Sequence, residues 1–138
     1  MPREDAGTQA RAWLSKARSD LRTIELVLPA DDAPLDTVAF HAQQAAEKAI
    51  KALLSFLGIQ PPHLHDLEEL VAALPEDALR ALALDADALA LLSQLAVAPR
   101  YPGWDDEDLD RQTIEDAVTE ARRVYDTIRR YLSRLGCD

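Results

Sequence analysis

The stretch PLDTVAFHAQQAAEKAIKALLSFLGIQPP, residues 34–62, carries the clearest helical pattern of the chain. Its apolar residues recur at intervals of three and four, which predicts a helix from Pro34 or Asp36 to Leu57. Gly58 and the two prolines that follow are stop signals for this helix. The apolar stripe is wide enough to be typical of a central bundle helix. It consists of Val38, Ala42, Ala45, Ala46, Ala49, Ile50, Leu53, Phe56 and Leu57.

The opposite face of the same helix is predominantly polar, and we expect it to be solvated and held by ion pairs. Glu47 and Lys51 have the spacing of a favourable i,i+4 ion pair. Gln43 is the exception, because it lies on the apolar side, where a buried amide needs a hydrogen-bond partner in the bundle or in an interface. The face comprises His41, Gln44, Glu47, Lys48, Lys51 and Ser55, with Phe40 among them.

Further helical patterns flank this central one. The first runs from Thr8, a candidate cap, to Leu28, and Pro29 ends it because a residue before proline disfavours helix. Later patterns predict helices over residues 65–74, 76–84, 85–98 and 109–135. Alternating strand patterns are absent from the sequence. The sequence therefore predicts an all-α fold, an up-and-down four-helix bundle with an additional short helix, in one domain over residues 1–138.

One carboxylate of the first predicted helix lies close to its apolar stripe. Asp20 is next to the directions of Trp13 and Ile24 on a helical wheel. An unpaired buried charge is costly, so a carboxylate here either has a partner or reaches water at the edge of the stripe. Both alternatives remain open from the sequence.

Composition limits the classes of function. The formal net charge is −10 and the pI is about 4.6, which disfavours sequence-independent RNA binding. The lone Cys137 provides neither a disulfide framework nor a metal cluster, and no apolar run is long enough to cross a bilayer. No glycine-rich phosphate loop or Glu-x-x-His pair occurs. We expect a cytoplasmic protein without membrane association, cofactor or metal.

The segment AVAPRYPGWDDEDL, residues 96–109, interrupts the helical sequence. Arg100 has a planar guanidinium that suits phosphate or carboxylate, and Tyr101 and Trp104 have rings on which a base can stack. Alternatively, the aromatic residues fill one end of the bundle and Arg100 pairs with Asp20 or with the acidic run. The sequence leaves both interpretations open.

Four stretches together resemble the HEPN domain, the higher eukaryotes and prokaryotes nucleotide-binding domain. They are WLSKARSDL (13–21), FHAQQAAEKAIKALL (40–54), HDLEELVAAL (65–74) and RYPG (100–103). The resemblance implies a helical bundle that forms a homodimer. It also implies a partner, a minimal nucleotidyltransferase, in a module similar to toxin–antitoxin pairs. Many family members are metal-independent ribonucleases whose motif is an Arg followed after four to six residues by a His.

No histidine follows Arg100 in this sequence, so the ribonuclease motif is absent and we assign no catalytic residue. The resemblance instead implies a nucleotide ligand, with phosphate on Lys48 and Arg100 and a base on Tyr101. The predicted ligand-binding residues are Asp20, Gln43, Lys48, Arg100 and Tyr101. The alternative is a ribonuclease toxin in which Arg100 acts with Tyr101 or with His41 from another helix.

Overall fold

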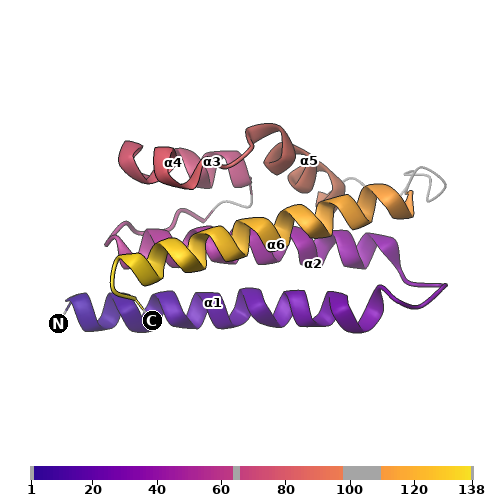
Figure 1. Ribbon diagram of the computed structural model, residues 1–138, viewed down its shortest axis with the longest axis horizontal. Helices are drawn as coiled ribbons and strands as arrows, with labels where there is room; N and C mark the ends of the chain where they lie inside the picture. The colour runs from indigo at the N-terminus through magenta and orange to yellow at the C-terminus, as the bar shows by residue number, and fades with distance from the viewer. Residues whose placement is uncertain (1, 64–65, 98–109, 138) are drawn as a thin grey trace.

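A computed structural model describes residues 2–63, 66–97 and 110–137 of the chain, and this part is helical without a strand (Figure 1). Three long helices dominate the fold, and three shorter ones connect the second of them to the third. The helices are α1 (Pro2–Val27), α2 (Leu35–Phe56), α3 (Leu67–Ala72), α4 (Glu76–Leu82), α5 (Ala86–Val97) and α6 (Arg111–Arg134). The all-α expectation is confirmed.

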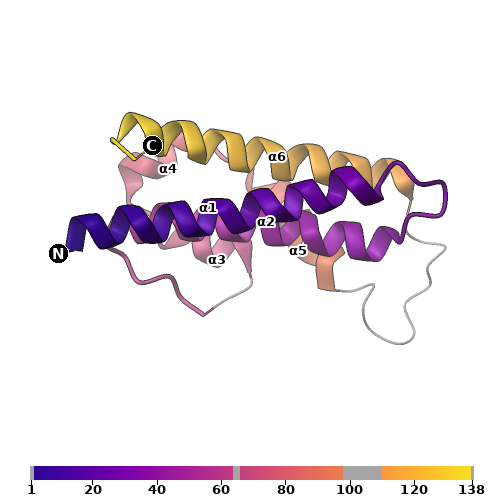
Figure 2. The same cartoon turned by 90° about the horizontal axis from the view of Figure 1, so that it is seen from below.

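Helix α2 lies at the centre of the bundle. It packs against α1 and α6 and also against α5 and α3, which lie on the side away from α1 (Figures 1 and 2). Most of its predicted apolar residues are buried, with Ile50 and Leu53 fully enclosed, whereas Phe56 and Leu57 at its end are half-buried. Because α2 has neighbours on several sides, little of its surface is exposed to solvent. The expectation of a solvated polar face is wrong for Glu47, Lys51 and Ser55, which are buried, whereas the other polar residues of this face are partly exposed.

The C-terminal end of α2 follows the predicted stop signals. Gly58 adopts a left-handed backbone conformation, with φ of 75°. Its amide donates to the carbonyl of Ser55, and the amide of Ile59 donates to the carbonyl of Leu54. These bonds satisfy carbonyls that the end of a helix would otherwise leave unpaired. The chain then leads into the segment up to residue 63, which lies beside the N-terminal half of α1 (Figure 2).

The start of α1 differs from the expectation. The helix begins at Pro2, and Thr8 lies inside it rather than capping it. Proline is compatible with the first turn of a helix, and the polar residues that follow are all tolerated in helices. The other boundaries agree with the sequence patterns to within three residues where both ends are described. At α4, the helix ends earlier than predicted because Ala83 has a positive φ of 48°.

Arg111 connects the beginning of α6 to the turn between α1 and α2. Its guanidinium donates to the backbone carbonyls of Leu28, at 2.8 Å, and Ala30, at 2.7 Å. Asp110 caps the same helix by accepting from the amide of Gln112. The two Arg111 bonds join the beginning of α6 to the α1–α2 turn, and Figure 2 shows these two parts of the backbone at the same end of the bundle. Among the described helices, none combines the length and apolar character needed to cross a membrane.

Candidate functional site

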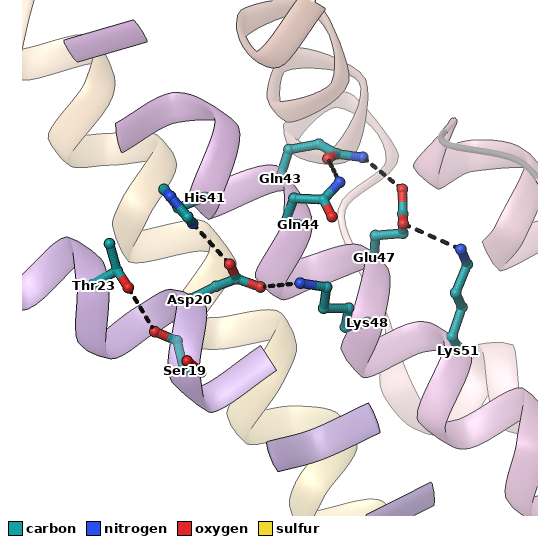
Figure 3. A network of polar contacts seen from close by, with 9 residues as sticks. All are labelled: Ser19, Asp20, Thr23, His41, Gln43, Gln44, Glu47, Lys48 and Lys51. Carbon is teal, nitrogen blue, oxygen red and sulfur yellow. Dashed lines mark hydrogen bonds and ion pairs between the residues drawn. The ribbon is translucent and has the colours of Figure 1, made fainter. Parts of the chain in front are cut away.

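Two groups of polar side chains follow α2 along its length (Figure 3). The first, which we call the Asp20 cluster, consists of Asp20, His41 and Lys48. Lys48 Nζ donates to Asp20 Oδ2 at 2.7 Å, and His41 Nδ1 lies 2.7 Å from Asp20 Oδ1. Since an ionised carboxylate only accepts hydrogen bonds, the Nδ1 atom of His41 carries the proton in this contact. Both carboxylate oxygens of Asp20 are therefore occupied.

The helical repeat explains the geometry of the Asp20 cluster. His41 and Lys48 are seven residues apart, which places them two turns apart on one side of α2. Helix α1 packs beside α2 and brings Asp20 between the two donors (Figure 3). The Asp20 side chain is nearly enclosed, and a charge in that position requires such compensation. Of the two alternatives that the sequence left open for Asp20, the structure shows the paired one.

The second group, the Glu47 cluster, consists of Gln43, Gln44, Glu47 and Lys51, all on α2. Gln43 Nε2 donates to Glu47 Oε1 at 3.1 Å, and Lys51 Nζ donates to Glu47 Oε2 at 3.2 Å. Gln44 Nε2 donates to Gln43 Oε1 at 2.8 Å. The predicted i,i+4 ion pair between Glu47 and Lys51 is confirmed. The Lys51 ammonium also lies over the ring of Trp13, 5.4 Å from its centroid.

The two clusters differ in their access to solvent. In the Glu47 cluster, the Glu47 side chain is 4% exposed and that of Lys51 is 11% exposed. In the Asp20 cluster, the carboxylate is 9% exposed, whereas Lys48 and His41 are 22% and 26% exposed. The buried centre of the Asp20 cluster is thus an anion, and its accessible rim is made of two donors. Such a rim is suited to receive an anionic ligand.

The predicted ligand-binding residues are distributed between these clusters and the segment beyond α5. Asp20 and Lys48 are in direct contact, and Gln43 lies in the neighbouring Glu47 cluster. Arg100 and Tyr101 lie outside the described residues. Sequence reasoning did not place His41 beside Asp20, although its seven-residue spacing from Lys48 was a usable signal. Over the described ranges, no group of three or more His, Cys, Asp and Glu side chains is arranged to hold a metal ion.

Comparisons with known proteins found one family model and two similar solved structures. The model of the HEPN domain matches residues 10–131. TT1696 from Thermus thermophilus has a similar crystal structure, with a TM-score of 0.71 and 27% identity over 88% of this chain and 97% of that one. The crystal structure of ST0689, described as an archaeal HEPN homologue, has a TM-score of 0.69 and 22% identity over 90% of this chain and 98% of that one. At this level of identity the likeness shows the fold alone. The comparison with curated proteins found no match.

Proposed function

The chain belongs to the HEPN domain family, and from that premise we propose that it is a non-catalytic binding protein. In this proposal it binds a nucleotide and serves as the partner subunit of a minimal nucleotidyltransferase, in a module similar to toxin–antitoxin pairs. The observation that carries the proposal is the donor rim of the Asp20 cluster. Lys48 and His41 both remain accessible while they compensate a buried carboxylate.

The nucleotide would bind across this rim and the segment beyond α5. Phosphate oxygens are received by Lys48 and by Arg100, whose planar guanidinium binds phosphate in a bidentate manner. Tyr101 supplies a ring for the base. Asp20 orients Lys48, and Gln43 belongs to the adjoining Glu47 cluster. The ligand competes with Asp20 for the Lys48 ammonium, so we expect modest affinity for a single phosphate and greater affinity for a triphosphate.

The partner role is supported by the distribution of charge. Most Lys and Arg residues lie on α1 and α6, whereas the segments between α1 and α6 are predominantly acidic. An acidic surface favours fast association with a basic protein surface. We propose that this surface contacts the nucleotidyltransferase and that the chain acts as a homodimer. Light scattering of the pure protein tests the second point, since a homodimer has twice the 15.3 kDa mass of the chain.

Calorimetric titration with ATP tests the nucleotide site. We expect saturable heat with the wild type and at least about tenfold weaker binding for Lys48→Met and for Arg100→Ala, since each removes a charge-assisted hydrogen bond. Lys16→Met is the matched control, because Lys16 is an exposed lysine of α1. Absence of heat with the wild type, or equal affinity in all four proteins, contradicts the nucleotide site.

A second candidate function, metal-independent ribonuclease activity, is favoured by one contact. Asp20 accepts the Nδ1 proton of His41, which leaves Nε2 available for proton transfer. A carboxylate that orients an imidazole in this way is typical of acid–base sites. In this candidate, Arg100 stabilises the phosphate in the transition state and His41 replaces the histidine that the family motif places after the arginine.

Incubation of the pure protein with total RNA in EDTA separates the two functions. The binding proposal predicts intact RNA. Cleavage that is lost in both His41→Ala and Arg100→Ala, and retained in His63→Ala, would establish the ribonuclease instead. His63 serves as the control because it is exposed and belongs to neither cluster.

A further inference from the structure

A hollow of about 320 Å³ lies between the N-terminal half of α1, the end of α2 and the segment after α2. Its volume is in the range of small-molecule sites. A neighbouring depression of about 240 Å³ shares part of its wall. The prolines of the segment stiffen one side of the hollow. The lining residues are Gln9, Trp13, Lys51, Ser55, Gln60, Pro61, Pro62 and His63.

The hydroxyl of Ser55 is the first sign of a ligand. Ser55 is 5% exposed and lines both depressions. Within the described part of the chain, its Oγ atom is buried without any hydrogen-bond partner. An unsatisfied buried hydroxyl destabilises a folded protein, and native structures contain few of them. A group of this kind in the wall of a hollow indicates a partner from outside the chain.

Lys51 and Trp13 supply the other two contacts. The Lys51 ammonium has three N–H donors, and Glu47 accepts from one of them. The same ammonium lies over the Trp13 ring. The half-buried Trp13 also borders a third, largely apolar depression with Gln9, Ala12 and Lys16. The wall of the hollow thus holds an aromatic side chain, a lysine and a serine, and rotation of Ser55 about χ1 brings its buried Oγ to a ligand.

We propose that this hollow binds a small, flat conjugated ring that carries acceptor oxygens in its plane. The ring lies against Trp13 and the adjoining prolines. Its oxygens accept from Lys51 Nζ and Ser55 Oγ. Carboxylate and ring-carbonyl oxygens share this chemistry, so an aromatic carboxylate and a pyrimidine base both fit. The site uses no residue of the Asp20 cluster and stands apart from the proposed nucleotide site.

Fluorescence of Trp13 provides a direct readout. The chain has two tryptophans, so a Trp104→Phe background leaves Trp13 alone. This protein is titrated with orotate, which carries both ring carbonyls and a carboxylate, and with uridine and benzoate, which carry one kind each. Cyclohexanecarboxylate and inorganic phosphate are the controls without a flat ring. We expect saturable quenching with orotate and with at least one of the simpler rings, which identifies the oxygen that the site prefers.

Ser55→Ala tests the geometry. The substitution removes only an unbonded hydroxyl, so the variant folds, and we expect orotate to bind about tenfold more weakly. Ser15→Ala, at an exposed position of α1, leaves binding unchanged. Trp13→Leu, followed by calorimetry, abolishes binding. Three outcomes overturn the proposal. The first is that no flat ring quenches the fluorescence saturably, and the second is that cyclohexanecarboxylate binds as tightly as orotate. The third is that Ser55→Ala binds orotate with unchanged affinity, which assigns the hydroxyl to bound water. None of these outcomes affects the ATP titration of Lys48.

Discussion

The Asp20 cluster and the Glu47 cluster contain the same chemical groups in different surroundings. Each pairs one carboxylate with a lysine of α2 and with one further hydrogen-bonding side chain (Figure 3). The hydrogen bonds within the Glu47 cluster join residues of a single helix, and Glu47 and Lys51 are enclosed by the bundle. In the Asp20 cluster the carboxylate comes from α1, and the α2 donors remain about one quarter exposed. Burial therefore gives the Glu47–Lys51 pair a mainly structural role, with Lys51 reached from the hollow beside Trp13, and leaves the Asp20–Lys48 pair open to phosphate.

The largest expected loss of stability comes from breaking the buried pair of Glu47 and Lys51. Glu47→Ala leaves the Lys51 ammonium enclosed without its carboxylate, and we expect it to lower the free energy of unfolding by about 3–5 kcal/mol. Urea denaturation measures the loss. Glu25→Ala is the control, because Glu25 is in an exposed ion pair with Arg22 and should cost less than about 1 kcal/mol. If both variants lost a similar amount of unfolding free energy, the structural role assigned to the Glu47 cluster would be contradicted.

A smaller loss is expected at the open pair. Asp20→Ala removes the carboxylate, but Lys48 and His41 can turn to water, so we expect a loss of about 1–2 kcal/mol in the free energy of unfolding. The same denaturation experiment applies, with Asp126→Ala as a control on the exposed face of α6. If Asp20→Ala were as destabilising as Glu47→Ala, the difference between the two clusters would be disproved.

The smallest effect is predicted for Ser55, one turn beyond Lys51. Because its hydroxyl has no partner among the residues that the structure describes, Ser55→Ala should leave the free energy of unfolding within about 0.5 kcal/mol of the wild type, or raise it slightly. Ser93 is the matched comparison, since its Oγ accepts from the amide of Leu67 at 3.3 Å. Ser93→Ala should cost about 1 kcal/mol. Thermal unfolding followed by circular dichroism distinguishes them, and a reversed order would assign Ser55 a bond within the protein.

The sequence alone predicted the helices and much of the core, because these follow from local periodicity and stop signals. Ile50 and Leu53 are enclosed as expected, and Gly58 ends α2 in a left-handed conformation. The surroundings of the polar face could not be predicted in this way. Periodicity assigns Lys51 to one side of a helix, but it does not reveal how many neighbours cover that side. Lys51 is buried for that reason.

The candidate site was predictable only in part. The need of Asp20 for a partner follows from its place near an apolar stripe. The identity of that partner does not, since His41 and Lys48 are separated from Asp20 by 21 and 28 residues. Such contacts depend on how α1 packs against α2, which no local pattern encodes. Arg100 and Tyr101 lie outside the described residues, and their place in the site stays a prediction.

Lysine side-chain NMR tests the difference between the clusters most directly. The chain has three lysines, so the Cε resonances of Lys16, Lys48 and Lys51 can be followed together. Titration with tripolyphosphate, which has no ring, should shift the Lys48 resonance saturably and leave those of Lys51 and the exposed Lys16 unchanged. A shift of the Lys51 resonance equal to that of Lys48, or an unchanged Lys48 resonance, would contradict the claim that the Asp20 cluster is the one open to a polyphosphate.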